Sequence, residues 1–225
     1  MDPAVQLYFA TAAFVATHFV TSTPLRAALI RVLGEKAYTG VYSLLAFATL
    51  GWMGWAYARA ADEPALWAGW RALPAYIMPI AFILVACGLF SRNPTLVGAD
   101  RLLKSKEPAR GIIRVTRHPI MWGFMLWALA HLLARGDLKG LVFFGGLFAV
   151  AGLGTLLIDQ RKAETLGEDW QRFAAVSSHL PFAAIAQGRN RFDAAEIGWR
   201  NPAIGIALYA LFLWIHPWLF GARPY

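Results

Sequence analysis

The chain has 225 residues, of which 58% are hydrophobic, 14% aromatic and 15% charged, and its formal net charge is +8. So few charges among so many apolar residues exclude an ordinary soluble domain and are typical of an integral membrane protein. The surplus basic residues lie mostly in the loops of such a protein, where they would contact anionic lipid headgroups, so we expect no nucleic-acid partner.

Six apolar segments approach the length needed to cross a hydrocarbon core of ~30 Å, which takes about 20 helical residues. In chain order they cover residues 4–20, 40–58, 74–90, 119–134, 138–158 and 202–220. The third and fourth are short, and helix tilt or local thinning of the bilayer would accommodate them. We therefore expect an all-α, polytopic membrane helix bundle with about six transmembrane helices, in a single domain that covers residues 1–225.

Stretches between these segments predict further structure at the membrane surface. Thr23 and Pro24 are typical of a helix start and Gly34 of a helix stop, so they predict a short interfacial helix. Residues 159–173 extend the fifth segment as an amphipathic helix, and the basic loop 91–117 is expected on the cytoplasmic surface.

Two sequence features of the apolar segments concern packing. The single cysteine, Cys87, lies within the third segment, so a CxxCH attachment of haem is excluded and a buried, unreactive thiol is expected. The fifth segment carries small residues, which allow another helix to approach closely. They are Gly145, Gly146, Ala149, Gly152 and Gly154.

The basic residues predict the topology. Of the 21 Lys and Arg residues, 16 lie in the loops that follow the first, third and fifth segments. Because cytoplasmic loops are enriched in Lys and Arg, these loops are expected inside and both termini outside. The sequence thus predicts a multi-pass protein of a bacterial inner membrane, with periplasmic termini and a basic surface against the lipid bilayer.

Histidines inside apolar segments are the strongest candidates for chemistry, because ionisable groups at membrane depth are costly. His18 lies in the first segment, His131 in the fourth and His216 in the sixth. His131 follows Trp127 and Phe124 on an aromatic helix face. The side chains that share a polar face with His18 are Thr11, Thr21 and Ser22.

For one buried histidine alone, an interhelical hydrogen bond is the expected role, but two imidazoles facing one cavity are the usual ligands of haem iron. His118 and His131 are 13 positions apart on one helix, which separates them by ~20 Å and about 140°, so they cannot bind the same metal. His18 and His131, offset by ~13 Å in depth, would suit a haem parallel to the membrane. His131 and His216 lie at nearly equal depth and would suit an upright haem, so depth leaves both pairs open.

The stretch from Arg117, RHPIMWG, followed by WALAH ending at His131, resembles the NnrU family. His18 and the closing stretch from His216, HPWLFG, fit the same pattern, so the resemblance covers nearly the whole chain. Bacterial members are associated with denitrification, through nitrite and nitric oxide reductase function. A plant relative, zeta-carotene isomerase, is a membrane enzyme with non-covalent haem b that isomerises a cis double bond.

The resemblance implies haem b held by His18 and His131 as the metal ligands, with Arg114 or Arg117 near a propionate. His118, Trp127 and His216 complete the residues expected around the cofactor. If both ligands stay bound, the iron would serve electron transfer or sensing. If one leaves, an apolar polyene or nitric oxide could bind, and denitrification proteins would be the partners. The family therefore suggests a haem-dependent isomerase without deciding between these roles.

A second resemblance gives an alternative. The RHP block with the later stretches ETLGEDWQRF, from Glu164, and LPF is similar to membrane methyltransferases of isoprenylcysteine and phospholipids. There Arg117, His118 and Glu164 would hold S-adenosylmethionine, although Met121 replaces the usual tyrosine. A third hypothesis is a non-enzymatic assembly or regulatory membrane factor whose histidines are structural.

Overall fold

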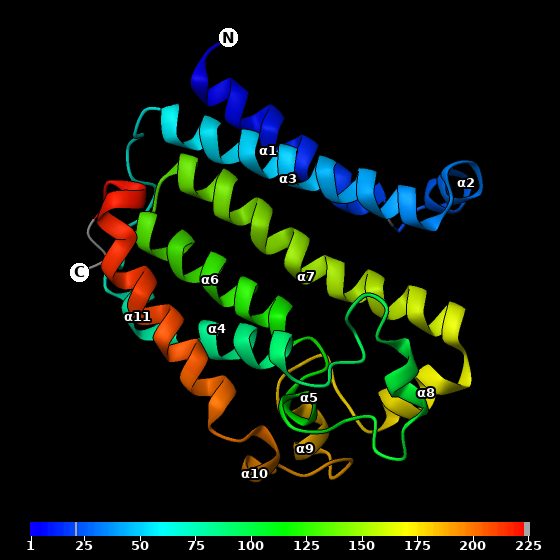
Figure 1. Ribbon diagram of the computed structural model, residues 1–225. Helices are drawn as coiled ribbons and strands as arrows, with labels where there is room; N and C mark the ends of the chain where they lie inside the picture. The colour runs from blue at the N-terminus through cyan, green and yellow to red at the C-terminus, as the bar shows by residue number, and fades with distance from the viewer. Residues whose placement is uncertain (21, 223–225) are drawn as a thin grey trace. The chain divides into compact units, whose positions relative to one another are not determined.

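The computed structural model describes residues 1–20 and 22–222. Its regular elements in this part of the chain are helical, which confirms the expected all-α class (Figure 1). In order they are α1 (Pro3–Val20), α2 (Pro24–Leu33), α3 (Glu35–Arg59), α4 (Leu73–Phe90), η1 (Asp100–Lys104), α5 (Ile112–Val115), α6 (Pro119–Arg135), α7 (Leu138–Leu166), α8 (Glu168–Ala175), α9 (Ala183–Ala186), α10 (Ala194–Ile197) and α11 (Arg200–Phe220).

Each of the six apolar segments forms most of one helix: α1, α3, α4, α6, α7 or α11. Within the described residues, α1, α4, α7 and α11 are long and apolar enough to cross a membrane. The 25 residues of α3 include Trp52, Trp55 and Tyr57 as well as several glycines, which dilute its hydropathy, and α6 has only 17 residues. A helical membrane protein is therefore supported, with four candidate spanning helices among the described residues, and the expected count of about six is not confirmed.

The helices group into two compact units. Unit 1 comprises Met1–Arg71 and Ala128–Leu157, and unit 2 comprises Ala72–Trp127 and Ile158–Tyr225. Both α6 and α7 therefore contribute residues to each unit. The expectation of one domain stays a prediction.

In unit 1, α1 and α3 lie side by side and run in opposite directions, joined through α2 (Figure 1). Leu7, Ala10 and Phe14 of α1 form the buried core with residues of α3, and side chains of α7 pack against it. A Cβ atom at Gly146 of α7 would lie 2.5 Å from the Thr11 Cγ2 atom. The close helix approach expected of the small residues in this segment is thus confirmed at Gly146.

In unit 2, α4 packs against α11, and a Cβ at Gly205 would lie 2.7 Å from the Ile83 Cα atom. A second core lies around Cys87, where Ile113, Trp170 and Phe173 are buried with it. The buried thiol was expected. The loop 91–117 is not only a surface loop, because its apolar residues fill this core.

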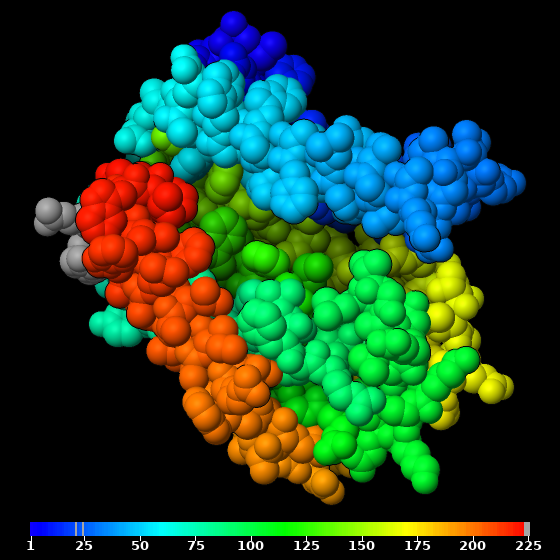
Figure 2. Space-filling model, in the orientation of Figure 1, coloured from blue at the N-terminus to red at the C-terminus, as the bar shows by residue number. Residues whose placement is uncertain are grey.

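Two interfacial helices differ in how well they match the sequence prediction. Helix α2 begins at Pro24 and ends at Leu33, and the next residue, Gly34, stops it as expected with a φ of 79°. The amphipathic extension of α7 is interrupted at Gly167, whose φ of 52° starts the separate helix α8. The outer surface of α11, orange to red in Figure 2, exposes apolar side chains such as Phe212 and Trp214. A surface of this kind suits a lipid environment.

Candidate functional site

His18 lies near the end of α1 and is half-buried. Its Nδ1 atom is 2.8 Å from the Phe14 carbonyl oxygen, which can only accept, so Nδ1 carries a proton and donates. A neutral imidazole in this tautomer has its lone pair on Nε2. The ring lies 4.3 Å from the Phe14 ring and 6.0 Å from the Tyr42 ring of α3, centroid to centroid. These contacts fix the orientation of the imidazole.

His131 lies in the part of α6 that belongs to unit 1 and is also half-buried. Its ring stacks on Phe144 of α7 with a centroid distance of 5.2 Å and an interplanar angle of 28°. Phe144 in turn contacts Tyr57 of α3 at 5.8 Å. The aromatic neighbours predicted for His131 were on its own helix, and periodicity within one helix could not have revealed Phe144.

His18 and His131 lie at different levels along the helices of unit 1. In Figure 1, α1 and α7 run in the same direction. Thr11 of α1 packs on Gly146, close to the level of Phe144 and His131. His18 is seven positions beyond Thr11 and therefore lies ~10 Å further along α1. Unit 1 thus holds one imidazole toward the α2 end and one toward the loop between α6 and α7.

The end of unit 1 near His131 is closed by an ionic cluster. The Arg135 guanidinium lies 2.7 Å from Asp62 and 2.5 Å from Asp137, and the Lys139 ammonium donates to the Ala60 carbonyl and lies 3.3 Å from Asp62. Hydrogen bonds from Arg135 and Lys139 lower the pKa of the Asp62 carboxyl. Two cations and two carboxylates balance, so this cluster carries no net charge.

In unit 2, Arg117 and His118 of the RHP block converge on Asp159 of α7. The Arg117 Nε and Nη2 atoms lie 2.8 and 2.6 Å from one carboxylate oxygen, and the His118 Nε2 atom lies 2.6 Å from the other. His118 is buried. Asp159 was not among the predicted site residues, because it lies in α7 while Arg117 and His118 precede α6, and such a spacing carries no periodic signal.

His179 lies beside this ionic group. Its ring centroid is 5.8 Å from that of His118 and 6.0 Å from that of Trp122, whose indole N–H donates to the His179 carbonyl. The Thr116 hydroxyl donates to the same carbonyl. Burial, followed by the nearby charge of His118, lowers the pKa of His179. His179 is therefore held as a packed, neutral ring at neutral pH.

Arg114 is buried and bonded to Glu196. Its Nε and Nη2 atoms donate to the two carboxylate oxygens at 2.7 and 2.8 Å, and its Nη1 donates to the Asn190 side-chain oxygen. The Gly111 N–H donates to the same carboxylate. The hydrogen bond from Arg114 is the main reason that the pKa of Glu196 falls to about 2. This pair links the start of α5 to α10.

The predicted cofactor residues divide between the units. His18 and His131 belong to unit 1, while Arg114, Arg117, His118, Trp127 and His216 belong to unit 2. In α11, the His216 Nδ1 lies 2.8 Å from the Ala222 carbonyl oxygen, and the His216 ring lies 4.8 Å from the Phe220 ring. Thr21, expected on the polar face of His18, lies outside the described residues.

Comparison with known proteins identifies the family. The model of a family described as NnrU protein matches residues 6–224, nearly the whole chain. The chain belongs to the NnrU family. It is also similar to two plant proteins named 15-cis-zeta-carotene isomerase, chloroplastic. The Arabidopsis thaliana protein is 42% identical over 79 residues, 35% of this chain and 22% of that protein. The Zea mays protein is 34% identical over 103 residues, 45% of this chain and 28% of that protein.

The matched regions therefore span roughly a quarter of the length of these relatives. No solved structure matches. The resemblance to NnrU proteins that the RHP block suggested is confirmed. The family match and the apolar helices together indicate a membrane protein.

Unit 1 of this NnrU protein has features that fit a bound cofactor. The Thr11 Oγ1 and Tyr38 Oη atoms are buried, and neither has a hydrogen-bond partner within the described part of the chain. A buried polar group without a partner costs about 1–3 kcal/mol, so such groups point to a ligand or to ordered water. The His18 imidazole carries its proton on Nδ1 and its lone pair on Nε2, which is the tautomer that binds a metal ion through Nε2. Neutral imidazoles and unpaired hydroxyls are suitable partners for the iron and the polar edge of haem b.

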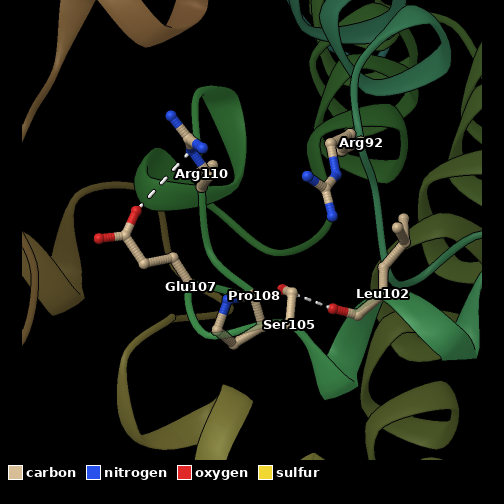
Figure 3. Close-up of a pocket in the computed structure, with 6 residues that line it drawn as sticks. All are labelled: Arg92, Leu102, Ser105, Glu107, Pro108 and Arg110. Atoms are coloured by element: carbon tan, nitrogen blue, oxygen red, sulfur yellow. Dashed lines mark hydrogen bonds and ion pairs between the residues drawn. The ribbon is translucent and has the colours of Figure 1, made fainter.

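Other parts of this NnrU protein offer less for a cofactor. Among the described residues, no group of three or more His, Cys, Asp and Glu side chains could hold a metal ion. A haem with two axial histidines does not require such a group, so the haem prediction stays a prediction. The hollow in Figure 3, between Arg92, Glu107 and Arg110, has a volume of about 10 Å³, which suits one water molecule. A larger hollow of about 200 Å³ lies beside Arg114 and Arg189.

Proposed function

We propose that this NnrU-family protein binds haem b in the membrane and isomerises a cis double bond of an apolar, conjugated polyene. The family match over residues 6–224 and the similarity to two proteins named 15-cis-zeta-carotene isomerase support the reaction type. The observation that carries the proposal is the location of His18 and His131 in one compact unit. Two imidazoles on different helices of that unit are the ligand set of a non-covalent haem.

In this proposal, the protein's own residues hold and orient the cofactor. The Phe14 carbonyl keeps the His18 Nδ1 protonated, so Nε2 is the atom that would bind the iron. Phe144 stacks on His131 and restricts its ring rotation. When bound, haem would supply an iron centre able to release one histidine and bind another ligand. The apolar helices exclude water, and a cis-to-trans conversion requires no atom or electron from another reactant.

The alternative functions, a role in denitrification and a methyltransferase, place different requirements on these residues. A haem iron with one exchangeable ligand would also bind nitric oxide, as a role in denitrification beside nitrite or nitric oxide reductases would require. For a methyltransferase, Arg117 and His118 would have to exchange Asp159 for S-adenosylmethionine, since both side chains are bonded to that carboxylate. Glu164, the third residue proposed for that cofactor, accepts a hydrogen bond from Gln160 instead.

An isomerisation assay tests the proposal. The full chain, purified in detergent and loaded with haem b, would be incubated with 15-cis-zeta-carotene, and the isomers would be separated by chromatography. We expect the wild-type protein to convert the 15-cis isomer and the His18→Ala variant to convert little of it. The matched unit 2 variant, His216→Ala, should convert as much as the wild type. Haem-loaded protein that converts no more substrate than free haem would contradict the isomerase assignment. A colourless protein that binds S-adenosylmethionine would support the methyltransferase alternative.

A further inference from the structure

We propose that Arg26 and Tyr38 bind a carboxylate of the cofactor at the His18 end of unit 1. The inference rests on the proposed function, because the carboxylate is a propionate of the haem that His18 ligates. Haem b carries two propionates, and ionised carboxylates are too costly to leave unpaired in hydrocarbon. They must reach a membrane surface and a cation there. Unit 1 carries basic side chains at both of its ends, and their surroundings differ.

The end near His131 is already neutralised. Arg135 is paired with Asp62 and Asp137, and Lys139 with Asp62, so two cations face two carboxylates. The Lys139 ammonium also donates to the Ala60 carbonyl. A propionate arriving here would have to displace a carboxylate that the protein itself supplies. The cluster therefore closes this end rather than receiving a further negative charge.

The end near His18 has the opposite character. The Arg26 guanidinium of α2 lies 5.7 Å from the centroid of the Tyr38 ring, and none of the ion pairs found among the described residues includes Arg26. The Tyr38 hydroxyl is buried and lacks a hydrogen-bond partner there. A guanidinium can only donate, and Arg26 lies over the face of the Tyr38 ring, so the phenolic O–H has no acceptor for its own proton. An anionic acceptor between them would satisfy both groups.

A continuous row of rings connects this pair to His18. The Tyr38 ring stacks on Tyr42 at 6.3 Å, and Tyr42 contacts the His18 ring at 6.0 Å. Tyr38 lies one turn nearer the start of α3 than Tyr42, which places it toward α2 and the membrane surface. A flat group bound at His18 and extending along this row would place its polar edge beside Tyr38 and Arg26.

The two arginines that the family resemblance suggested for this role are occupied elsewhere. Arg114 donates to both carboxylate oxygens of Glu196, and Arg117 donates to Asp159. Both belong to unit 2, whereas His18 and His131 belong to unit 1. Arg26 is the basic side chain of unit 1 that lies against an unpaired, buried hydroxyl.

The test compares haem b with its dimethyl ester, in which both carboxylates are blocked. The purified full chain would be titrated with each, and the dissociation constants would be read from the Soret absorbance. A hydrogen-bonded ionic contact predicts that wild type prefers haem b by about tenfold or more. We expect Arg26→Gln and Tyr38→Phe each to reduce that preference several-fold, while Arg31→Gln, on an exposed residue of the same helix, leaves it unchanged.

The outcomes separate the two proposals. If wild type binds neither compound, the haem proposal fails and this inference fails with it. If wild type binds both equally, or if both variants keep its preference, haem binding stands and the carboxylate site is wrong. Tyr38→Phe removes a single oxygen atom from a buried ring, so it provides a result even if Arg26→Gln does not fold.

Discussion

His118 and Asp159 are 41 positions apart in the chain, yet the His118 Nε2 atom and an Asp159 carboxylate oxygen lie 2.6 Å apart. The other carboxylate oxygen accepts from Arg117. One acidic residue of α7 thus binds the two consecutive basic residues that immediately precede α6. The RHP block, which would be the cofactor site in a methyltransferase, acts in this structure as a connection between the two helices.

Replacing Asp159 with Asn should therefore destabilise the protein. The change leaves the half-buried Arg117 and the buried His118 without their acidic partner. Breaking a buried ion pair in this way costs about 3 kcal/mol or more. Thermal unfolding in detergent measures the effect. The matched control is Asp169→Asn, whose partner Arg172 is exposed and whose ion pair is worth less than about 1 kcal/mol. Equal melting temperatures for the two variants would contradict the structural role of Asp159.

The Arg114–Glu196 pair predicts a dependence of stability on pH. The folded-state pKa of Glu196, about 2, lies below the ordinary value of 4.5, so the pair contributes its full stability above pH ~4.5 and loses it as the pH falls toward 2. Glu196→Gln should lower the melting temperature at pH 7 and flatten this part of the pH profile. Glu107→Gln is the control, because that carboxylate is exposed and 3.7 Å from Arg114. A wild-type profile in Glu196→Gln would refute the assignment.

Replacing glycine with alanine should have opposite effects at two helix positions, one in a close helix contact and one in open space. A Cβ at Gly205 would meet the backbone of Ile83 at 2.7 Å, so Gly205→Ala should force α11 away from α4 and cost about 1–3 kcal/mol. Gly154 of α7 has nothing within 4 Å of its added Cβ, and Gly154→Ala should be neutral or stabilise by up to about 1 kcal/mol. Thermal unfolding of both variants checks this. A tolerated Gly205→Ala would show that the two helices are not in close contact.

Cys87 offers a direct measure of the second core. It is fully buried among residues of α4, α5 and α8, so a thiol-reactive dye should label the native protein slowly and the unfolded protein completely. Because Cys87 is the single cysteine, the rise in fluorescence on heating would report the unfolding of unit 2. Rapid labelling of the native protein at 25 °C would be inconsistent with this core.

Sequence patterns predicted the helices well because a long apolar run can form few structures other than a helix. The start of α2 at Pro24, its end before Gly34 and the close approach at Gly146 were all visible in local chemistry. The break at Gly167 was not predicted, because the apolar spacing of Leu166, Trp170 and Phe173 continues across it. Gly167 has a positive φ, and Trp170 and Phe173 of the following helix lie in the core around Cys87.

Residues paired across the chain lay beyond sequence reasoning. Nothing in the spacing of Arg114 and Glu196, or of His131 and Phe144, marks them as neighbours, since each pair joins two elements. The buried Tyr38 hydroxyl likewise became noticeable only when its surroundings were known. The sequence did indicate which histidines to consider, because a costly polar residue within an apolar segment needs a reason.

The absorbance spectrum of the purified protein tests the central claim most directly. After expression with haem available, we expect a Soret band in wild type and in His216→Ala, and its loss or marked weakening in His18→Ala and His131→Ala. Melting temperatures of the four proteins would show that the variants remain folded. A wild-type protein without a Soret band would contradict haem binding. A band that survives in both His18→Ala and His131→Ala but is lost in His216→Ala would show that the ligands have been assigned to the wrong histidines.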